Sequence, residues 1–183
     1  MQKNRHFFEN NFINFTLLII FLGLILRIFS SLYFYTNAMN TGHGPASLDA
    51  LRYHLVALEI YNMSFTYEYL FKTKILPQMG YTYSILLGYL YKIFYPSILV
   101  GYYFSIFVWF MSCFVIWAIA KELNIKKIYI MMLIFLYSFI PSSIFLSSVT
   151  LKEIYQVLFY SFSIYFFIRL HKELGLNNFL MFL

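Results

Sequence analysis

The stretch FTLLIIFLGLILRIFSSLYFY, residues 15–35, decides the fold class of this chain. Its only charged residue is Arg27. About 20 apolar residues in a helix are enough to cross the hydrocarbon core of a bilayer. We therefore predict a transmembrane helix at about 15–35. A charge is costly at membrane depth, so Arg27 should face protein or reach toward an interface.

The rest of the chain has the same character. It has 183 residues, of which 62% are hydrophobic and 11% charged. A soluble domain of this size would carry far more charge, so the composition predicts an all-α polytopic membrane protein. Three further segments are predicted to cross, at about 98–120, 128–146 and 154–168. A last apolar segment, 177–183, is too short to cross, so we expect residues 1–183 to be a single membrane domain and the N-terminal part of a longer protein.

The N-terminal residues MQKNRHFFENNF resemble the start of a signal peptide. The apolar stretch after them is too long, and no small-x-small cleavage site follows, so we predict a retained signal anchor. Lys3 and Arg5 then place the N-terminus in the cytoplasm. Residues 36–97 become an external loop, and the expected location is the plasma (inner) membrane. The net charge of +6 indicates topology here, and no nucleic acid partner is expected.

Residues 47–62, SLDALRYHLVALEIYN, interrupt the apolar runs with a charged pattern. Ser47 is a suitable N-cap, and leucines then recur at helical spacing. Asp49, Arg52, Tyr53 and Glu59 lie on the opposite side of the predicted helix. The pattern indicates an amphipathic helix on the membrane surface, inside the external loop.

Residues 81–94 form a second short apolar segment, which could cross or could lie on the outer surface. Its length is typical of interfacial or re-entrant helices. Charge placement favours the second alternative, because a crossing would put two later basic clusters outside. These clusters contain Lys121, Lys126, Lys127, Arg169 and Lys172. We therefore predict surface helices at both 47–62 and 81–94.

Two carboxylates are the candidates for chemistry. Asp49, the only aspartate of the chain, is predicted in the first turn of its helix, where it can be a base, a metal ligand or simply a favourable helix-start residue. Glu153 follows in PSSIFLSSVTLKE, residues 141–153. Thr150 and Glu153 also fit a capping box, which is the alternative without chemistry. If 81–94 does not cross, Asp49 and Glu153 face the same external compartment.

Several basic side chains are predicted to share that compartment. Outward positive charge runs against the usual distribution, which favours an anionic partner such as a lipid phosphate. Ordinary headgroup contact is the alternative. The candidate substrate-binding residues are Arg52, Tyr53, Lys72, Lys74 and Lys152.

In order along the chain, four segments resemble those of membrane-embedded type C (GT-C) glycosyltransferases, which use polyprenyl-phosphate-linked sugars. Asp49 with Arg52-Tyr53-His54 is similar to the acidic motif of that family's first external loop. PQMGYTYSILLGYLYKIF, residues 77–94, is similar to its proline-glycine-tyrosine segment. AKEL, residues 120–123, and PSSIFLSSVTLKE complete the match. The group includes protein mannosyltransferases and the lipid A aminoarabinose transferase.

The resemblance implies a GT-C-like N-terminal helical bundle and transfer of a sugar from a polyprenyl-phosphate carrier to a glycan, lipid or protein acceptor on the outer, periplasmic face. It implies that Asp49 is the base or a ligand to a divalent cation, Mg²⁺ or Mn²⁺, and that Glu153 is the second acidic contact. Some relatives carry paired acidic residues, whereas this chain has a lone Asp49 and the pair Lys152-Glu153. Its dependence on a metal therefore stays open.

Two other interpretations stay open from the sequence. A lipid-linked oligosaccharide polymerase or ligase would use a similar lipid substrate on the same face. A non-enzymatic membrane subunit, or an inactive fragment, would need neither carboxylate. A transporter is disfavoured because few charges other than Arg27 fall inside the apolar segments.

Overall fold

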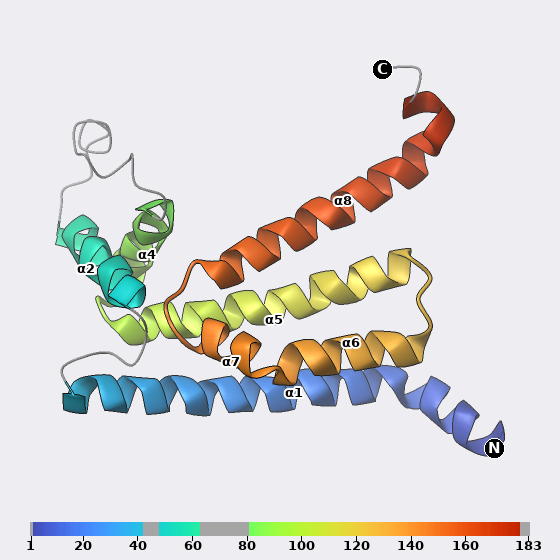
Figure 1. The fold of residues 1–183 in the computed structure, drawn as a ribbon, viewed down its shortest axis with the longest axis horizontal. Coiled ribbons are helices and arrows are strands. Elements are labelled where there is room, and N and C mark those ends of the chain that lie inside the picture. Colours follow the sequence, from blue (N-terminus) through green and yellow to red (C-terminus); the bar gives the residue numbers. More distant parts are fainter. Residues whose placement is uncertain (1, 42–47, 63–80, 180–183) are drawn as a thin grey trace.

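The computed structural model describes residues 2–41, 48–62 and 81–179, and the side chains of residues 11–37, 49–62 and 82–173. Within these residues every regular element is a helix, as predicted (Figure 1). The helices are α1 (Gln2–Thr41), α2 (Leu48–Asn62), α4 (Tyr81–Ile93), α5 (Ile98–Glu122), α6 (Lys127–Phe139), α7 (Pro141–Ser148) and α8 (Glu153–Phe179).

Two of the described helices are long and apolar enough to cross a membrane, over Asn11–Asn37 in α1 and Ile98–Glu122 in α5. The segment at 128–146, predicted to cross, is divided into α6 and α7, which meet at a bend of 58° beside Pro141 and count as a third span only if taken together, so its crossing stays a prediction. α8 is long enough but not apolar enough to count as such a span, because Gln156 and several tyrosines and serines interrupt its apolar residues. Its crossing at 154–168 stays a prediction.

α1 runs antiparallel to α5, whereas α8 runs parallel to α5 (Figure 1). Phe12, near the start of α1, contacts Trp117 near the end of α5, with ring centroids 6.5 Å apart. Phe34, further along α1, contacts Phe145 of α7 at 5.6 Å. α7 therefore lies further along α1 than α6 does, at an angle of 58° to α6, and α1 packs against α5, α6 and α7 (Figure 1).

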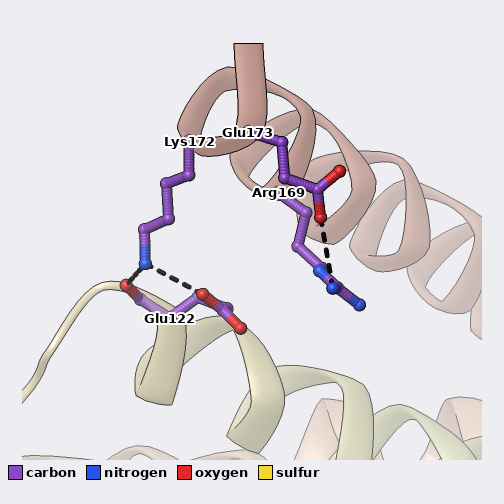
Figure 2. A network of polar contacts seen from close by, with 4 residues as sticks. All are labelled: Glu122, Arg169, Lys172 and Glu173. Atoms are coloured by element: carbon purple, nitrogen blue, oxygen red, sulfur yellow. Dashed lines mark hydrogen bonds and ion pairs between the residues drawn. The ribbon is translucent and has the colours of Figure 1, made fainter. Parts of the chain in front are cut away.

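One end of this bundle, which we call the lysine end, gathers the basic residues Lys121, Lys126, Lys127, Arg169 and Lys172. Here the Lys172 ammonium donates to the main-chain oxygen of Glu122 and to its Oε2, the latter at 2.8 Å, so it links α8 to the end of α5 (Figure 2). Arg169 and Glu173 form a second pair at 3.2 Å. These side chains are largely exposed, so each pair contributes at most about 1 kcal/mol.

The opposite end, the carboxylate end, holds α2, α4, the first turns of α5 and the link between α7 and α8 (Figure 1). α4 is 13 residues long, or about 20 Å, which is shorter than the hydrocarbon core of a bilayer. It packs against α2 and the start of α5. Gly88 permits this approach, because a β-carbon there would lie 2.7 Å from Ile60 Cγ2.

α2 forms at the predicted place, but its apolar residues divide between two faces. Ala57 is fully buried and Ile60 is 5% exposed, both in the contact with α4. Leu51 and Leu55, part of the predicted apolar stripe, are 38% and 51% exposed. Leu51 and Leu55 therefore point away from the protein, whereas Leu58 packs against the cluster of Ala57, Leu87 and Tyr91. The small Ala57 and the β-branched Ile60 make the closest contact with α4, because they fit against its backbone at Gly88.

Candidate functional site at the carboxylate end

Asp49 lies in the first turn of α2 and is exposed. The next residue, Ala50, is buried in a cluster with Tyr102 of α5 and with Val149 and Leu151 of the link between α7 and α8. The start of α2 is thus fixed against the segment that leads into α8. The helix macrodipole favours the negative charge of Asp49 at this position.

Glu153 is the first residue of α8 and lies at the same end of the bundle. It is half-buried, and its Oε2 is shielded from solvent with no hydrogen-bond partner in the described part of the chain. The capping box is not formed: the Thr150 hydroxyl is buried without a hydrogen-bond partner in that same part. The Glu153 carboxylate is therefore not used in a cap, and one of its oxygens is left for another partner.

The link between α7 and α8 is packed tightly onto α5. Thr150 and Val149 are fully buried. A β-carbon at Gly101 would lie 2.7 Å from Thr150 Oγ1 and 3.1 Å from Leu87 Cδ1. Only a glycine allows both contacts, so Gly101 sets how closely the segment before Glu153 approaches α5.

A chain of aromatic rings connects the helices that carry the two carboxylates. Tyr53 of α2 contacts Tyr83 of α4 at 5.2 Å, and Tyr83 contacts Tyr155 of α8 at 4.7 Å. Phe104 of α5 contacts Tyr155 in turn at 5.7 Å. Burial raises the pKa of the Tyr83 hydroxyl well above its usual range, so this group stays protonated and uncharged.

The predicted binding residues have different surroundings. Arg52 is exposed on α2 and Lys152 is half-buried beside Glu153. The sequence predicts that Tyr53 shares a binding face with them, but its ring packs between helices against Tyr83. Lys72 and Lys74 lie outside the described residues.

Sequence reasoning missed the buried hydroxyl groups of this end. Besides Glu153 Oε2, six hydroxyl groups here are shielded from solvent and have no hydrogen-bond partner within the described residues. They belong to Tyr83, Ser84, Tyr102, Ser148, Thr150 and Tyr155. Buried polar groups usually have a partner, which is often ordered water. Their sequence signal was the excess of tyrosines, which is equally typical of a membrane interface.

His54 lies between α2 and α4. Its Nδ1 is 2.6 Å from the Tyr91 hydroxyl. Burial lowers the pKa of His54 and raises that of Tyr91. Both groups are therefore neutral at physiological pH, and the pair joins the two helices.

The two carboxylates alone do not build a metal centre. No group of three or more His, Cys, Asp and Glu side chains converges among the residues that the structure describes. A cation held by Asp49 or Glu153 would take most of its ligands from hydroxyls, main-chain oxygens, water or substrate, a set that suits Mg²⁺ better than zinc. The divalent-cation prediction stays a prediction.

The chain was compared with protein-family models, with characterised proteins and with solved structures, and none of them matches it. The interpretation of the carboxylate end therefore depends on its own geometry and on the resemblance described above.

Proposed function

We propose that the chain takes part in transferring a sugar from a polyprenyl-phosphate carrier to an acceptor at the outer face of a membrane. The observation that carries the proposal is the common packing of the start of α2 with the segment that leads into α8, through Ala50, Tyr102, Val149 and Leu151. This packing puts both candidate carboxylates, Asp49 and Glu153, at one end of the bundle.

The chemistry assigned to each residue follows from its surroundings. Asp49 is exposed and can reach an acceptor hydroxyl as the general base, a role that contributes typically about 10²–10⁴-fold to a rate. Glu153 has one shielded, unpaired oxygen and orients the sugar or a cation. Arg52 and Lys152 supply positive charge to the departing lipid phosphate.

The arrangement of the helices supports the sidedness of this proposal. The basic residues gather at the lysine end, as the positive-inside rule expects of the cytoplasmic end. α4, at the other end, packs on α2 and is too short to cross. A carrier lipid with its phosphate at the outer surface would meet the carboxylate end.

The test is Asp49→Asn in the full-length protein, reconstituted in vesicles. A panel of radiolabelled polyprenyl-phosphate hexoses and pentoses serves as donor, with native envelope glycans, lipids and proteins as acceptors. We expect transfer to fall at least about 100-fold, with unchanged membrane insertion. Glu59→Gln is the matched control, since Glu59 is also exposed on α2. Normal transfer by Asp49→Asn would remove Asp49 from the mechanism.

A further inference from the structure

Arg27, in the middle of α1, is the most deeply buried charged residue that the structure describes, with no exposed surface. Its guanidinium lies 3.6 Å above the centre of the Trp109 ring of α5. Its Nη1 donates to the main-chain oxygens of Gly23, at 3.0 Å, and Ser138, at 2.8 Å. Its Nε and Nη2 donate to the hydroxyls of Ser147, at 2.7 Å, and Ser143, at 3.0 Å.

The acceptors lie on either side of the break between α6 and α7. In a continuous helix, the N–H of residue 141 would bond to the oxygen of Tyr137, and that of residue 142 to the oxygen of Ser138. Pro141 has no N–H, and Ile140 before it adopts an extended conformation with ψ 127°. The last bond of α6 is Ile140 N–H to Leu136 O. The next two carbonyls need donors from elsewhere.

Arg27 supplies these donors. It bonds to Ser138 O and makes a long contact of 3.5 Å with Tyr137 O, the two carbonyls that the break releases. The C-terminal end of a helix also carries partial negative charge, which favours a cation there. Gly23, one turn before Arg27, brings α1 close enough, because a β-carbon on it would lie 3.1 Å from Ser138 Cβ.

We propose that Arg27 is a positioning residue: its guanidinium replaces the backbone donors that Pro141 removes, and so holds the 58° bend that directs α7 toward the carboxylate end. α7 then leads through Val149 and Thr150 into Glu153. The link from the bend to transfer of a sugar rests on the proposed function, whereas the link from Arg27 to the bend rests on the contacts alone.

The test compares Arg27→Met, Arg27→Lys, Pro141→Ala and the double variant Arg27→Met/Pro141→Ala in the full-length protein in lipid nanodiscs. Two readouts are independent of transfer. One is the melting temperature. The other is crosslinking by a short bifunctional thiol reagent after Phe34→Cys and Phe145→Cys in a Cys113→Ala background, because the rings of Phe34 and Phe145 are in contact.

Arg27→Met should lower the melting temperature by roughly 5–10 °C, because it leaves buried acceptors unpaired, and should reduce crosslinking several-fold. Arg27→Lys keeps the positive charge but loses the planar guanidinium with its several N–H donors. Its melting temperature and crosslinking should therefore fall between those of wild type and Arg27→Met. In the double variant, the alanine that replaces Pro141 has an N–H that can donate to Tyr137 O in a straighter helix. We expect the melting temperature of this variant to recover by at least half, while crosslinking and transfer stay low.

That divergence between stability and crosslinking is the signature of positioning. A purely structural role predicts that both recover together, and such a result would overturn the proposal. Wild-type stability and crosslinking in Arg27→Met would overturn it as well. If crosslinking responds as expected but neither the wild type nor any variant transfers a sugar, the role of Arg27 at the bend stands and the proposed function is wrong.

Discussion

Thr150 Oγ1 lies 2.7 Å from the point where a β-carbon on Gly101 would be. The Thr150 hydroxyl thus packs on the main chain of Gly101, where the link between α7 and α8 crosses the start of α5. The position of Glu153, three residues later, depends on that approach. A pair of substitutions can therefore move the second carboxylate without touching it.

Gly101→Ala should destabilise the protein by about 1–3 kcal/mol, the usual cost of overpacking a buried contact. It should also lower transfer, because the displaced link carries Glu153 with it. Thr150→Ala removes the clashing Oγ1 and Cγ2 atoms, so the combination Gly101→Ala/Thr150→Ala should recover most of both losses. Thermal unfolding and the donor assay measure the two effects. Equal losses in the single and double variants would show that Thr150 does not set this contact.

Trp109→Leu should cost more than the loss of apolar volume alone, because the Trp109 ring also stabilises the Arg27 charge. We expect a coupling free energy of about 1–2 kcal/mol between Trp109→Leu and Arg27→Met in a double-mutant cycle. Trp109→Phe keeps an aromatic face and is the matched control, with a smaller coupling. Additive effects of the two substitutions would mean that the ring only fills space.

Acidification should loosen the contact between α2 and α4. The pKa of His54 in the folded protein is lowered below its ordinary value of 6.5, so the unfolded state binds more protons as the pH falls past that value. The stabilising effect of neutral His54 is complete above about pH 6.5 and is lost as the pH falls toward the folded pKa. Hydrogen exchange of the α2 amides, corrected for intrinsic rates, should accelerate as the pH is lowered from about 7.5 to about 5.

His54→Gln is the control for that experiment, because glutamine does not titrate and can still reach the Tyr91 hydroxyl. The pH dependence of exchange in α2 should disappear in this variant. A dependence that persists unchanged would assign the titration to another group.

Sidedness can be measured with single cysteines in a Cys113→Ala background. A membrane-impermeant maleimide should label Arg52→Cys and Lys152→Cys from the outside, and Lys126→Cys and Lys172→Cys only after the membrane is opened. The reason is that the first two lie at the carboxylate end and the others at the lysine end. Labelling of Lys126→Cys from the outside would place the basic cluster on the wrong face and contradict the proposed location of the site.

The sequence predicted the helices well and their contacts poorly. Apolar periodicity is a local signal, so α2, α4 and the long apolar helices were found near their true positions. The partners of Arg27 lie more than 100 residues away, at Ser138 and Ser147. No local pattern in α1 contains them, so the prediction stopped at the requirement that Arg27 face protein or an interface.

Other outcomes have local causes. Pro141 between two apolar stretches predicts a kink or a helix end, and the structure has the bend there. The sequence predicts an apolar leucine face on a surface helix but not the contact of Ala57 with α4, because hydrophobicity does not show that the close approach at Gly88 selects for small size. The capping box fits the spacing of Thr150 and Glu153, yet burial of Thr150 against Gly101 takes its hydroxyl out of reach.

The burial of Arg27 has a consequence for how the chain is made. When α1 leaves the ribosome, Trp109 and the carbonyls of α6 have not yet been synthesised, and a lone arginine at the centre of a helix costs about 2.5–3.5 kcal/mol on insertion scales. The translocon must therefore accept α1 at a disadvantage, or retain it until the later helices arrive. Early biogenesis should thus be slow and sensitive to truncation, since a nascent chain that ends before Ser147 lacks one of the hydrogen-bond acceptors of the Arg27 guanidinium.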